Sequence, residues 1–168
     1  SGKYLDYLCE FENYIFVHSI NSQIMPNAIK RGGEQSDNPI KILYLGKIGY
    51  LEEVEKFLKE MCNDTRFTLS FVGVGSEKVK EMAASMGCNN VEFVGKFDSS
   101  ETNSYLEKAD IIYNLYGDQK PCERTALSNK LYYAVCLNAP ILVYKNTYMY
   151  EVANNCGIAF AADECPKG

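Results

Sequence analysis

Three polar residues open a predicted helix, and their types suit the binding of an anion. Ser128, Asn129 and Lys130 come directly before the apolar positions of residues 128–137. A helix N-terminus carries about half a positive charge and several unpaired N–H groups, and the lysine would add a cation. The triplet therefore predicts a phosphate site. The plainer interpretation also stands, in which Ser128 caps the helix and Lys130 is simply exposed.

Two predicted strands end in glycine followed by lysine, at Gly46-Lys47 and at Gly95-Lys96. Glycine permits a tight turn and lets a ligand approach the backbone. One such pair is explained by a turn and a solvated lysine. Two pairs at equivalent positions, together with Lys130, favour an anion site.

A third strand end, Gly73-Val74-Gly75, is half of a dinucleotide fingerprint. Lys78 stands where the third glycine would fall, and Glu77 brings negative charge to the start of the next helix. A nicotinamide or flavin site is therefore rejected. No G-x-x-x-x-G-K-[ST] phosphate loop occurs either.

The other reactive side chains predict no catalytic residue. His18 has no nucleophile and orienting group arranged around it in the sequence, and Asp118 and Glu123 are loop acids that could contact a sugar. With one histidine and no C-x-x-C pair, no metal site is expected. The cysteines are interpreted as reduced thiols, mostly small core residues, and they are Cys9, Cys62, Cys88, Cys122, Cys136, Cys156 and Cys165.

Strands and helices that alternate along the chain must position these groups. Continuous apolar runs predict buried parallel strands, and apolar residues at helical spacing predict helices. The expected strands are 40–46, 67–73, 91–95, 109–116, 140–144 and 157–160, and the expected helices are 51–62, 76–87, 99–108, 128–137 and 147–155. The alternation predicts an α/β fold, a Rossmann-like three-layer sandwich whose parallel sheet has helices on both faces. Ligands of such sheets bind at the carboxyl ends of the strands, where the strand order reverses.

Composition narrows the classes of partner. The net charge is −5 over 168 residues with no basic patch, which argues against a nucleic-acid partner. No apolar run reaches about 18 residues, so no membrane span is predicted. Ahead of the alternating elements we expect a helix at 3–11, a strand at 14–18 and a polar linker at 25–39. Reduced cysteines without a visible signal peptide predict a cytoplasmic protein.

Three stretches resemble the group 1 retaining glycosyltransferases, in the order and spacing of that family. KILYLGKIG is similar to the family's strand followed by glycine and Arg or Lys, and VEFVGKFDSSETNSYLEKADIIYNLY is similar to its V-x-F-x-G … A-D-hydrophobic run. SNKLYYAVCLNAPILVYKNTYMYEVANNCGIAF is similar to its P-N-K-L segment and the strand, glutamate and glycine that follow. Together they span about residues 40–162.

The resemblance implies a two-domain GT-B fold, whose C-terminal Rossmann-like domain binds the nucleotide-sugar donor. Residues 39–168 would be that domain, and residues 1–38 would come from the interdomain region. In this family the acceptor and part of the catalytic machinery belong to the N-terminal domain. The closing helices usual in such domains do not follow before Gly168. We therefore expect a fragment of a longer chain.

Donor-binding residues are carried over position by position. The set is Gly46, Lys47, Gly73, Gly75, Val94, Gly95, Lys96, Ser128, Asn129, Lys130 and Tyr133. Gly46-Lys47 would hold the diphosphate, Val94–Lys96 would face the nucleobase, and the amides of 128–129 would meet the diphosphate. Glu53 stands where the family has a second lysine.

The sequence departs from the family at its paired glutamates, which would fall at Thr125 and Tyr133. A carboxylate that binds ribose hydroxyls contributes about 1.5–3 kcal/mol per hydrogen bond, and tyrosine cannot replace it. Three explanations remain open: Glu123 substitutes, the donor lies differently, or activity has been lost.

The predicted function is donor binding by a hexosyl-transferring glycosyltransferase of polysaccharide biosynthesis, inactive as this isolated domain. The nucleotide sugar is the substrate, and no metal or other cofactor is expected. The acceptor would be a saccharide, lipid or protein bound through the missing domain, with membrane-surface association of the full-length protein. A non-catalytic binding or scaffold domain is the main alternative, and an epimerase of the same fold is a remoter one.

Overall fold

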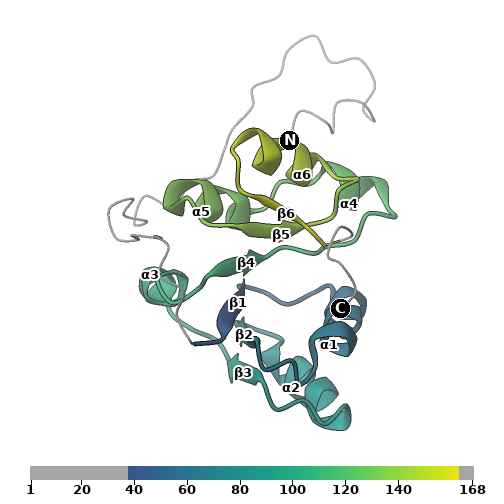
Figure 1. Cartoon of the computed structure of the whole chain (residues 1–168), viewed down its shortest axis with the longest axis vertical. Helices are drawn as coiled ribbons and strands as arrows, with labels where there is room; N and C mark the ends of the chain where they lie inside the picture. The colour runs from purple at the N-terminus through teal and green to yellow at the C-terminus, as the bar shows by residue number, and fades with distance from the viewer. Residues whose placement is uncertain (1–37, 163–168) are drawn as a thin grey trace.

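Six parallel strands form one sheet, in the order β3-β2-β1-β4-β5-β6 (Figure 1). The computed structural model describes residues 38–162. The predicted helix at 3–11, the strand at 14–18, His18 and nearly all of the linker at 25–39 lie outside the described residues. The strand order reverses between β1 and β4, where a parallel α/β sheet forms its ligand crevice.

The observed elements follow the predicted alternation. In chain order they are β1 (Ile40–Leu45), α1 (Leu51–Met61), β2 (Phe67–Val72), α2 (Ser76–Ser85), β3 (Val91–Val94), the 3₁₀ helix η2 (Ser99–Glu101), α3 (Thr102–Leu106), β4 (Ile111–Tyr113), α4 (Pro121–Thr125), α5 (Asn129–Leu137), β5 (Ile141–Val143), α6 (Tyr148–Asn155) and β6 (Ala159–Ala161). The α/β fold class and the parallel sheet are thus confirmed.

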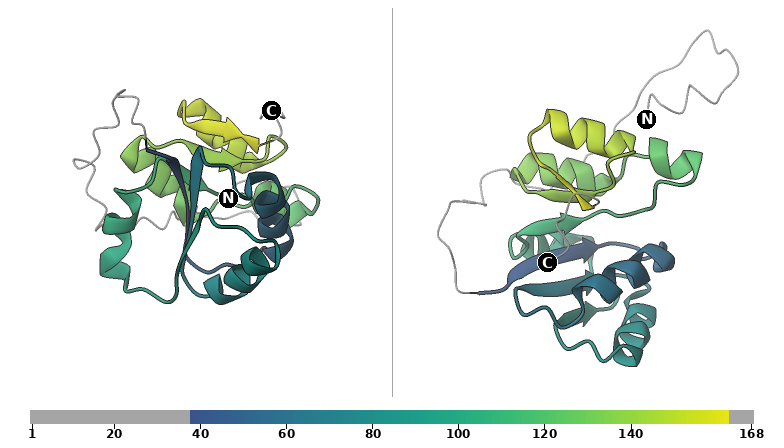
Figure 2. Two further views of the ribbon diagram at one scale, coloured as in Figure 1. Left: turned by 60° about the horizontal axis from the view of Figure 1, so that its bottom comes forward. Right: turned by 45° about the vertical axis from the view of Figure 1, so that its right-hand side comes forward.

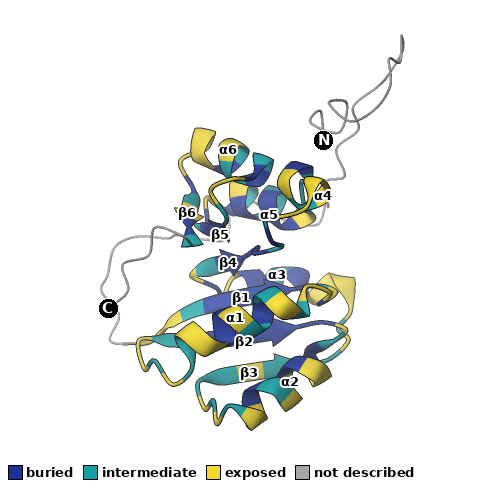
Figure 3. Cartoon of the chain, turned by 90° about the vertical axis from the view of Figure 1, so that its right-hand side faces the viewer, coloured by how far each residue is buried: buried dark blue, intermediate teal, exposed yellow. Residues whose placement is uncertain are grey.

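Helices cover both faces of the sheet (Figures 2 and 3). An apolar core lies on each face. On one face, Leu43 and Ile112 pack with residues of α3, α5 and α6. On the other, Ile42 and Tyr44 pack with residues of α1 and α2. Successive residues of a strand point to opposite faces of the sheet. Because both faces are covered, the residues of β1 that point to either face must be apolar. This explains why its sequence is a continuous apolar run.

Two local features of the structure were not predicted. Asp98 caps the helical segment after β3, because its side chain accepts the Ser100 N–H at 2.9 Å. The short helix α4 was not predicted, although Pro121 at its first position is a usual helix start. Within residues 38–162, no helix is both long enough and apolar enough to span a membrane.

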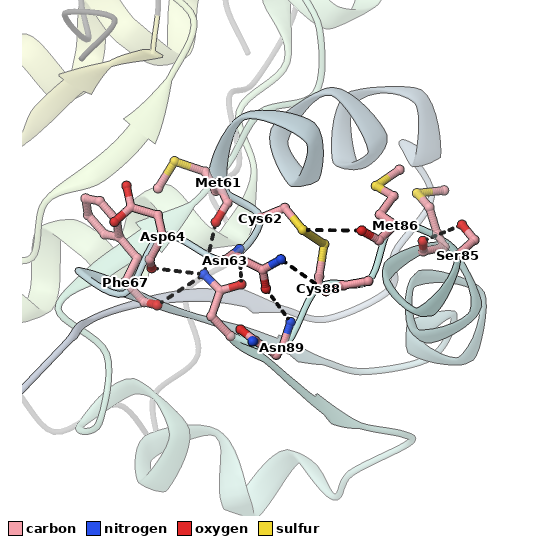
Figure 4. The surroundings of a disulfide bond; sticks show 12 residues. Met61, Cys62, Asn63, Asp64, Phe67, Ser85, Met86, Cys88 and Asn89 are labelled. Carbon is pink, nitrogen blue, oxygen red and sulfur yellow. Dashed lines mark hydrogen bonds between the residues drawn. A yellow bond between two sulfur atoms is a disulfide. The ribbon is translucent and has the colours of Figure 1, made fainter.

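The interpretation of the cysteines as reduced thiols is wrong for Cys62 and Cys88, and their interpretation as core residues is wrong for Cys122 and Cys156. Cys62 and Cys88 form a disulfide, with their Cα atoms 5.1 Å apart (Figure 4). Cys122 and Cys156 are exposed, and Cys136 is half-buried. Cys62 ends α1 and Cys88 follows α2, so the bond joins the two helices on one face of the sheet.

Side-chain amides reinforce the region of this disulfide. Asn63 donates to the Gly87 carbonyl oxygen at 3.1 Å and accepts the Asn89 N–H at 2.9 Å (Figure 4). Asn90 donates to the Met61 carbonyl oxygen at 3.0 Å. These contacts hold together the ends of α1 and α2 at the amino edge of the sheet, away from the strand ends at which ligands bind.

Candidate functional site

The candidate site lies at the carboxyl ends of β1 and β4, where the strand order reverses. Three segments meet there: residues 46–50 after β1, residues 114–120 after β4, and the start of α5. Contacts of Lys130 on α5 with Tyr44 on β1 and Tyr116 after β4 place these segments together. Lys130 at the start of α5 therefore lies beside the carboxyl end of β1.

Gly73 and Gly75 serve the packing of two loops. A Cβ on Gly73 would lie 2.0 Å from the Gly46 carbonyl oxygen, and one on Gly75 would lie 2.8 Å from the Ile48 carbonyl oxygen. The Ile48 N–H also donates to the Val74 carbonyl oxygen at 2.9 Å. The loop after β1 rests directly on the loop after β2, so contact between the chain's own backbones explains this G-x-G pair.

Gly46 has a different environment. Its φ is +109°, and a Cβ at this position would meet nothing within 4 Å. Lys47, which follows it, is exposed. Of the three strand-end glycines, Gly46 alone combines a positive φ with open space at its Cβ position. Its N–H is bonded to the Val72 carbonyl oxygen, so a ligand would approach the Cα side of this residue.

Val94, Gly95 and Lys96 lie at the end of β3, two strands away from β1. Two strand spacings separate the backbones of the two glycine-lysine pairs by about 10 Å. The Val94 carbonyl oxygen accepts the Gly73 N–H at 2.9 Å, and the side chain of Glu77 lies 3.3 Å from a Cβ placed on Gly95. The structure thus separates the two glycine-lysine pairs.

Ser128 does not cap α5 through its side chain. Its hydroxyl donates instead to the side-chain oxygen of Asn114, at 2.7 Å. Asn114 follows β4 and is 4 % exposed. The N–H groups at the start of α5 therefore donate no hydrogen bond to the Ser128 side chain, although the Leu131 N–H donates to the Ser128 carbonyl oxygen at 3.1 Å. Asn129 at the first helical position is exposed.

Lys130 is buried, with 5 % of its surface exposed, so the interpretation of it as a simply exposed side chain is wrong. Its Nζ lies 3.8 Å from the centre of the Tyr44 ring and 4.8 Å from that of Tyr116. It donates to the Tyr116 hydroxyl at 3.1 Å. Burial lowers the pKa of Lys130 to about 7, while the ring faces act in the opposite direction because they attract the ammonium form.

A third tyrosine, Tyr50, stacks on Tyr116. The Tyr50 ring lies parallel to that of Tyr116, with centres 4.4 Å apart and an angle of 14° between the planes. Burial raises the pKa of Tyr44 and of Tyr116. Both phenols are therefore neutral hydrogen-bonding groups at physiological pH.

Glu123 is engaged by its own loop. Its carboxylate accepts the N–H groups of Gln119 at 3.1 Å and Lys120 at 3.0 Å, and the Lys120 ammonium lies 3.3 Å away. The backbone hydrogen bond from Lys120 is the main reason that the pKa of Glu123 is lowered. These bonds hold residues 117–120, so Glu123 is not a spare carboxylate that could replace the missing glutamates.

The two positions of the family's paired glutamates have structural roles in this chain. Thr125 is buried and its hydroxyl donates to the Pro121 carbonyl oxygen at 2.8 Å, within α4. Tyr133 lies on α5, half-buried against the core formed with α3 and α6. Neither residue offers a charge to a ligand.

A small hollow opens between the carboxyl ends of β4 and β5. It measures about 10 Å³ for the centre of a water-sized sphere, which is room for roughly one water molecule. Its lining residues are Asn114, Tyr116, Gly117, Glu123, Tyr144, Thr147 and Met149. A ligand larger than water therefore does not fit inside this hollow.

Sequence reasoning missed Tyr44 and Asn114 as parts of this site, and it placed Tyr116 only among the residues that follow a strand. Tyr44 was counted only as part of a buried strand. Tyr116 and Asn114 end the sequence ADIIYNLYG, at the strand end where site residues are expected. Their positions directly after a buried strand were the available signal. No group of three or more metal-ligating side chains occurs among residues 38–162.

Known structures share this fold. The chain is similar to a glycosyltransferase from Rickettsia africae ESF-5, with 20 % identity over 75 % of this chain and 34 % of that one, and a TM-score of 0.53. It is also similar to AviGT4, a glycosyltransferase involved in avilamycin A biosynthesis, with 17 % identity over 74 % and 38 % of the two chains and a TM-score of 0.51. A candidate UDP-N-acetylglucosamine 2-epimerase from Listeria monocytogenes matches at 14 % identity over 73 % and 32 % of the chains, with a TM-score of 0.46.

These matches define the class of domain. It is a Rossmann-like α/β domain with the fold of one half of a GT-B glycosyltransferase. The chain spans about a third of the length of the solved structures it matches. No protein-family model and no curated protein matches the sequence.

Proposed function

We propose that this chain is the donor-binding domain of a glycosyltransferase and that it binds a nucleoside diphosphate sugar. The observation that carries the proposal is the open space at the Cβ position of Gly46, a residue with positive φ, next to the exposed Lys47. The start of α5 lies beside it, across the point where the strand order reverses. The glycosyltransferase fold supports the same assignment.

The site's chemistry would be the stabilisation of a leaving diphosphate. Hydrogen-bond donors fixed in advance contribute most where charge develops in the transition state. Here the donors would be the Lys47 ammonium and the free N–H groups at the start of α5, and no metal ion is needed for this role. A hexosyl group would pass to an acceptor bound by the missing domain, in polysaccharide synthesis.

One observation favours a second function, a non-catalytic binding or scaffold domain. The family's ribose-binding carboxylate is absent, since its position is Tyr133, and Glu123 is held by the backbone of residues 119–120. A domain without that carboxylate would bind a diphosphate weakly and would not hold the ribose in a fixed position.

Backbone amide NMR titration with UDP, GDP and ADP separates the two functions. We expect saturable shifts at Gly46, Lys47 and residues 128–130 with one of the three nucleotides, at millimolar concentration. Lys47→Ala should weaken that binding about tenfold, because a charge-assisted hydrogen bond is lost. Lys80→Ala, an exposed lysine on α2, is the matched control and should change nothing. No shift with any nucleotide, or equal binding by Lys47→Ala, would favour the non-catalytic domain.

A further inference from the structure

Lys130 is a buried cation without a counter-ion. Among residues 38–162 no carboxylate pairs with it, and α5 itself, with the sequence NKLYYAVCL, contains none. A charge removed from water is normally compensated by a partner. The described partners of this amine are the two tyrosine rings and the Tyr116 hydroxyl.

Its contacts join three elements of the candidate site. Tyr44 belongs to β1, one residue before the last of that strand, and its hydroxyl donates to the Lys47 carbonyl oxygen at 3.2 Å. Tyr116 follows β4 and stacks against Tyr50, the residue before α1. The Lys130 side chain is therefore connected to both sides of the loop at 46–50 through one tyrosine each.

We propose that Lys130 is a positioning residue of the anion site: its ammonium holds Tyr44 and Tyr116, and through them the loop at 46–50, in the arrangement that binds a diphosphate. Its positive charge also attracts that ligand from below. Binding of the diphosphate and protonation of Lys130 are therefore coupled, so each favours the other. This inference rests on the proposed function, because it names Lys130 as the residue that positions the proposed diphosphate site and gives that site a pH dependence.

The neighbouring titratable groups leave Lys130 as the proton-binding group of this cluster. Tyr44 faces it from β1 and Tyr116 from the segment after β4, with Tyr50 behind Tyr116. Burial raises the pKa of Tyr44 and Tyr116, so both stay neutral where the amine titrates. Loss of the proton removes the attraction between the ammonium and the ring faces and the charge felt by the ligand.

The first test follows the titration of Lys130 itself in the 168-residue chain. The Cε and Hε chemical shifts of its lysines are recorded from pH 5.5 to 10, with Lys130 assigned by its loss in Lys130→Met. We expect the Lys130 signal to titrate well below that of exposed Lys80, and the amides of Gly46 and Lys47 to follow the same midpoint. A Lys130 midpoint equal to that of Lys80, or loop amides that ignore it, would overturn the positioning role.

The second test measures affinity against pH. UDP-glucose, GDP-glucose and ADP-glucose are the probes, because their diphosphates are esterified at both ends and do not titrate in this range. We expect the affinity of the wild type to fall about fivefold or more from pH 6 to pH 9, the lower end of usual coupling energies. By linkage, saturating ligand should then raise the Lys130 midpoint by about 0.7 pH unit.

Lys130→Met keeps a side chain of similar length without the charge. The affinity of this variant for the nucleotide sugars should be low and independent of pH. Identical pH profiles for the wild type and this variant would overturn the coupling. If the variant does not fold, the test is the shift of the Lys130 titration midpoint when the wild type is saturated with ligand. A midpoint that does not shift on saturation refutes the inference. Failure of all three probes to bind the wild type at any pH would instead refute the proposed function.

Discussion

The carbonyl oxygen of Gly46 occupies the place where a side chain on Gly73 would begin, with a separation of 2.0 Å from the Cβ position. The two residues end adjacent parallel strands, since Leu45 and Val72 are partners in the register of β1 and β2. The Gly46 N–H donates to the Val72 carbonyl oxygen at 2.8 Å, and the Gly73 N–H donates to the Val94 carbonyl oxygen at 2.9 Å. The turn after β1 is therefore built directly against the turn after β2.

This contact predicts unequal effects of two identical substitutions. Gly73→Ala should destabilise the fold by about 3 kcal/mol or more, because a backbone clash adds to an unfavourable φ of +136°. Gly46→Ala, the matched control, introduces only the unfavourable φ and should cost about 1–2 kcal/mol. Urea denaturation of the two variants measures both values. Equal losses of stability would show that the loops can separate without cost.

The positions of most helices and strands could be predicted from the sequence. β1, with IKILYL, is apolar on both faces, and α1 places Val54, Phe57 and Leu58 on one side at helical spacing. These patterns are local, because the period of a strand or helix is written in neighbouring residues. Gly46-Lys47 was recognised as the end of a strand for the same reason, because it directly follows this apolar run.

Contacts between distant segments were the part that could not be predicted. Lys130 meets Tyr44, which is far away in the sequence, and a lysine at a helix start gives no local sign of burial. The pairing of Cys62 with Cys88 is similar, since spacing alone does not determine a disulfide. Both cysteines do follow helices on the same face of the sheet, and this equivalence was the available signal.

The Cys62–Cys88 disulfide predicts a dependence of stability on redox conditions. It closes a loop with a sequence separation of 26, which corresponds to about 3.5 kcal/mol in the chain-entropy model. Cys62→Ser or a reducing buffer should lower the free energy of unfolding by about 2–4 kcal/mol. Cys122→Ser, at an exposed free cysteine, is the control and should have almost no effect.

The same measurement bears on the predicted cytoplasmic location, because disulfides rarely persist in reducing compartments. Thermal unfolding of the wild type is compared with and without dithiothreitol, next to Cys62→Ser under both conditions. The reductant should affect only the wild type. A wild type insensitive to reductant would mean that the two cysteines do not form a stabilising bond in solution.

Replacement of Lys130 by methionine should raise the free energy of unfolding by an amount that depends on pH. Burial lowers the pKa of Lys130 to about 7, from 10.5 for an ordinary lysine. Below pH 7 both the folded and unfolded chains carry the charge, and the fold bears the full cost of burying it. Between pH 7 and 10.5 the unfolded chain binds more protons, so the stability of the wild type rises with pH.

Lys130→Met should therefore be more stable than the wild type at pH 6, by about 1–4 kcal/mol. The difference should shrink steadily at pH 7.5 and pH 9, in urea denaturation at constant ionic strength. Lys80→Met serves as the control, because an exposed lysine should give no such trend. A constant difference across this range would mean that Lys130 is charged throughout and that the ring faces compensate its burial.

The absent ribose carboxylate predicts a gain of binding when it is restored. Tyr133→Glu places a glutamate where the resemblance to retaining glycosyltransferases expects one, at a half-buried position in α5. A charge-assisted hydrogen bond contributes about 1.5–3 kcal/mol, so the preferred nucleotide should bind tenfold tighter or better. Lost packing of the tyrosine ring should lower stability at the same time, by about 1–3 kcal/mol.

Tyr133→Gln is the matched control, because it has the size of glutamate and the same loss of packing but no charge. If the glutamate variant binds tighter and the glutamine variant does not, the carboxylate is the missing part of an otherwise intact donor site. If neither gains affinity while both remain folded, the ribose does not approach this face of α5. The chain's ligand would then lie differently from a donor in the resembled family, and the non-catalytic function would be favoured.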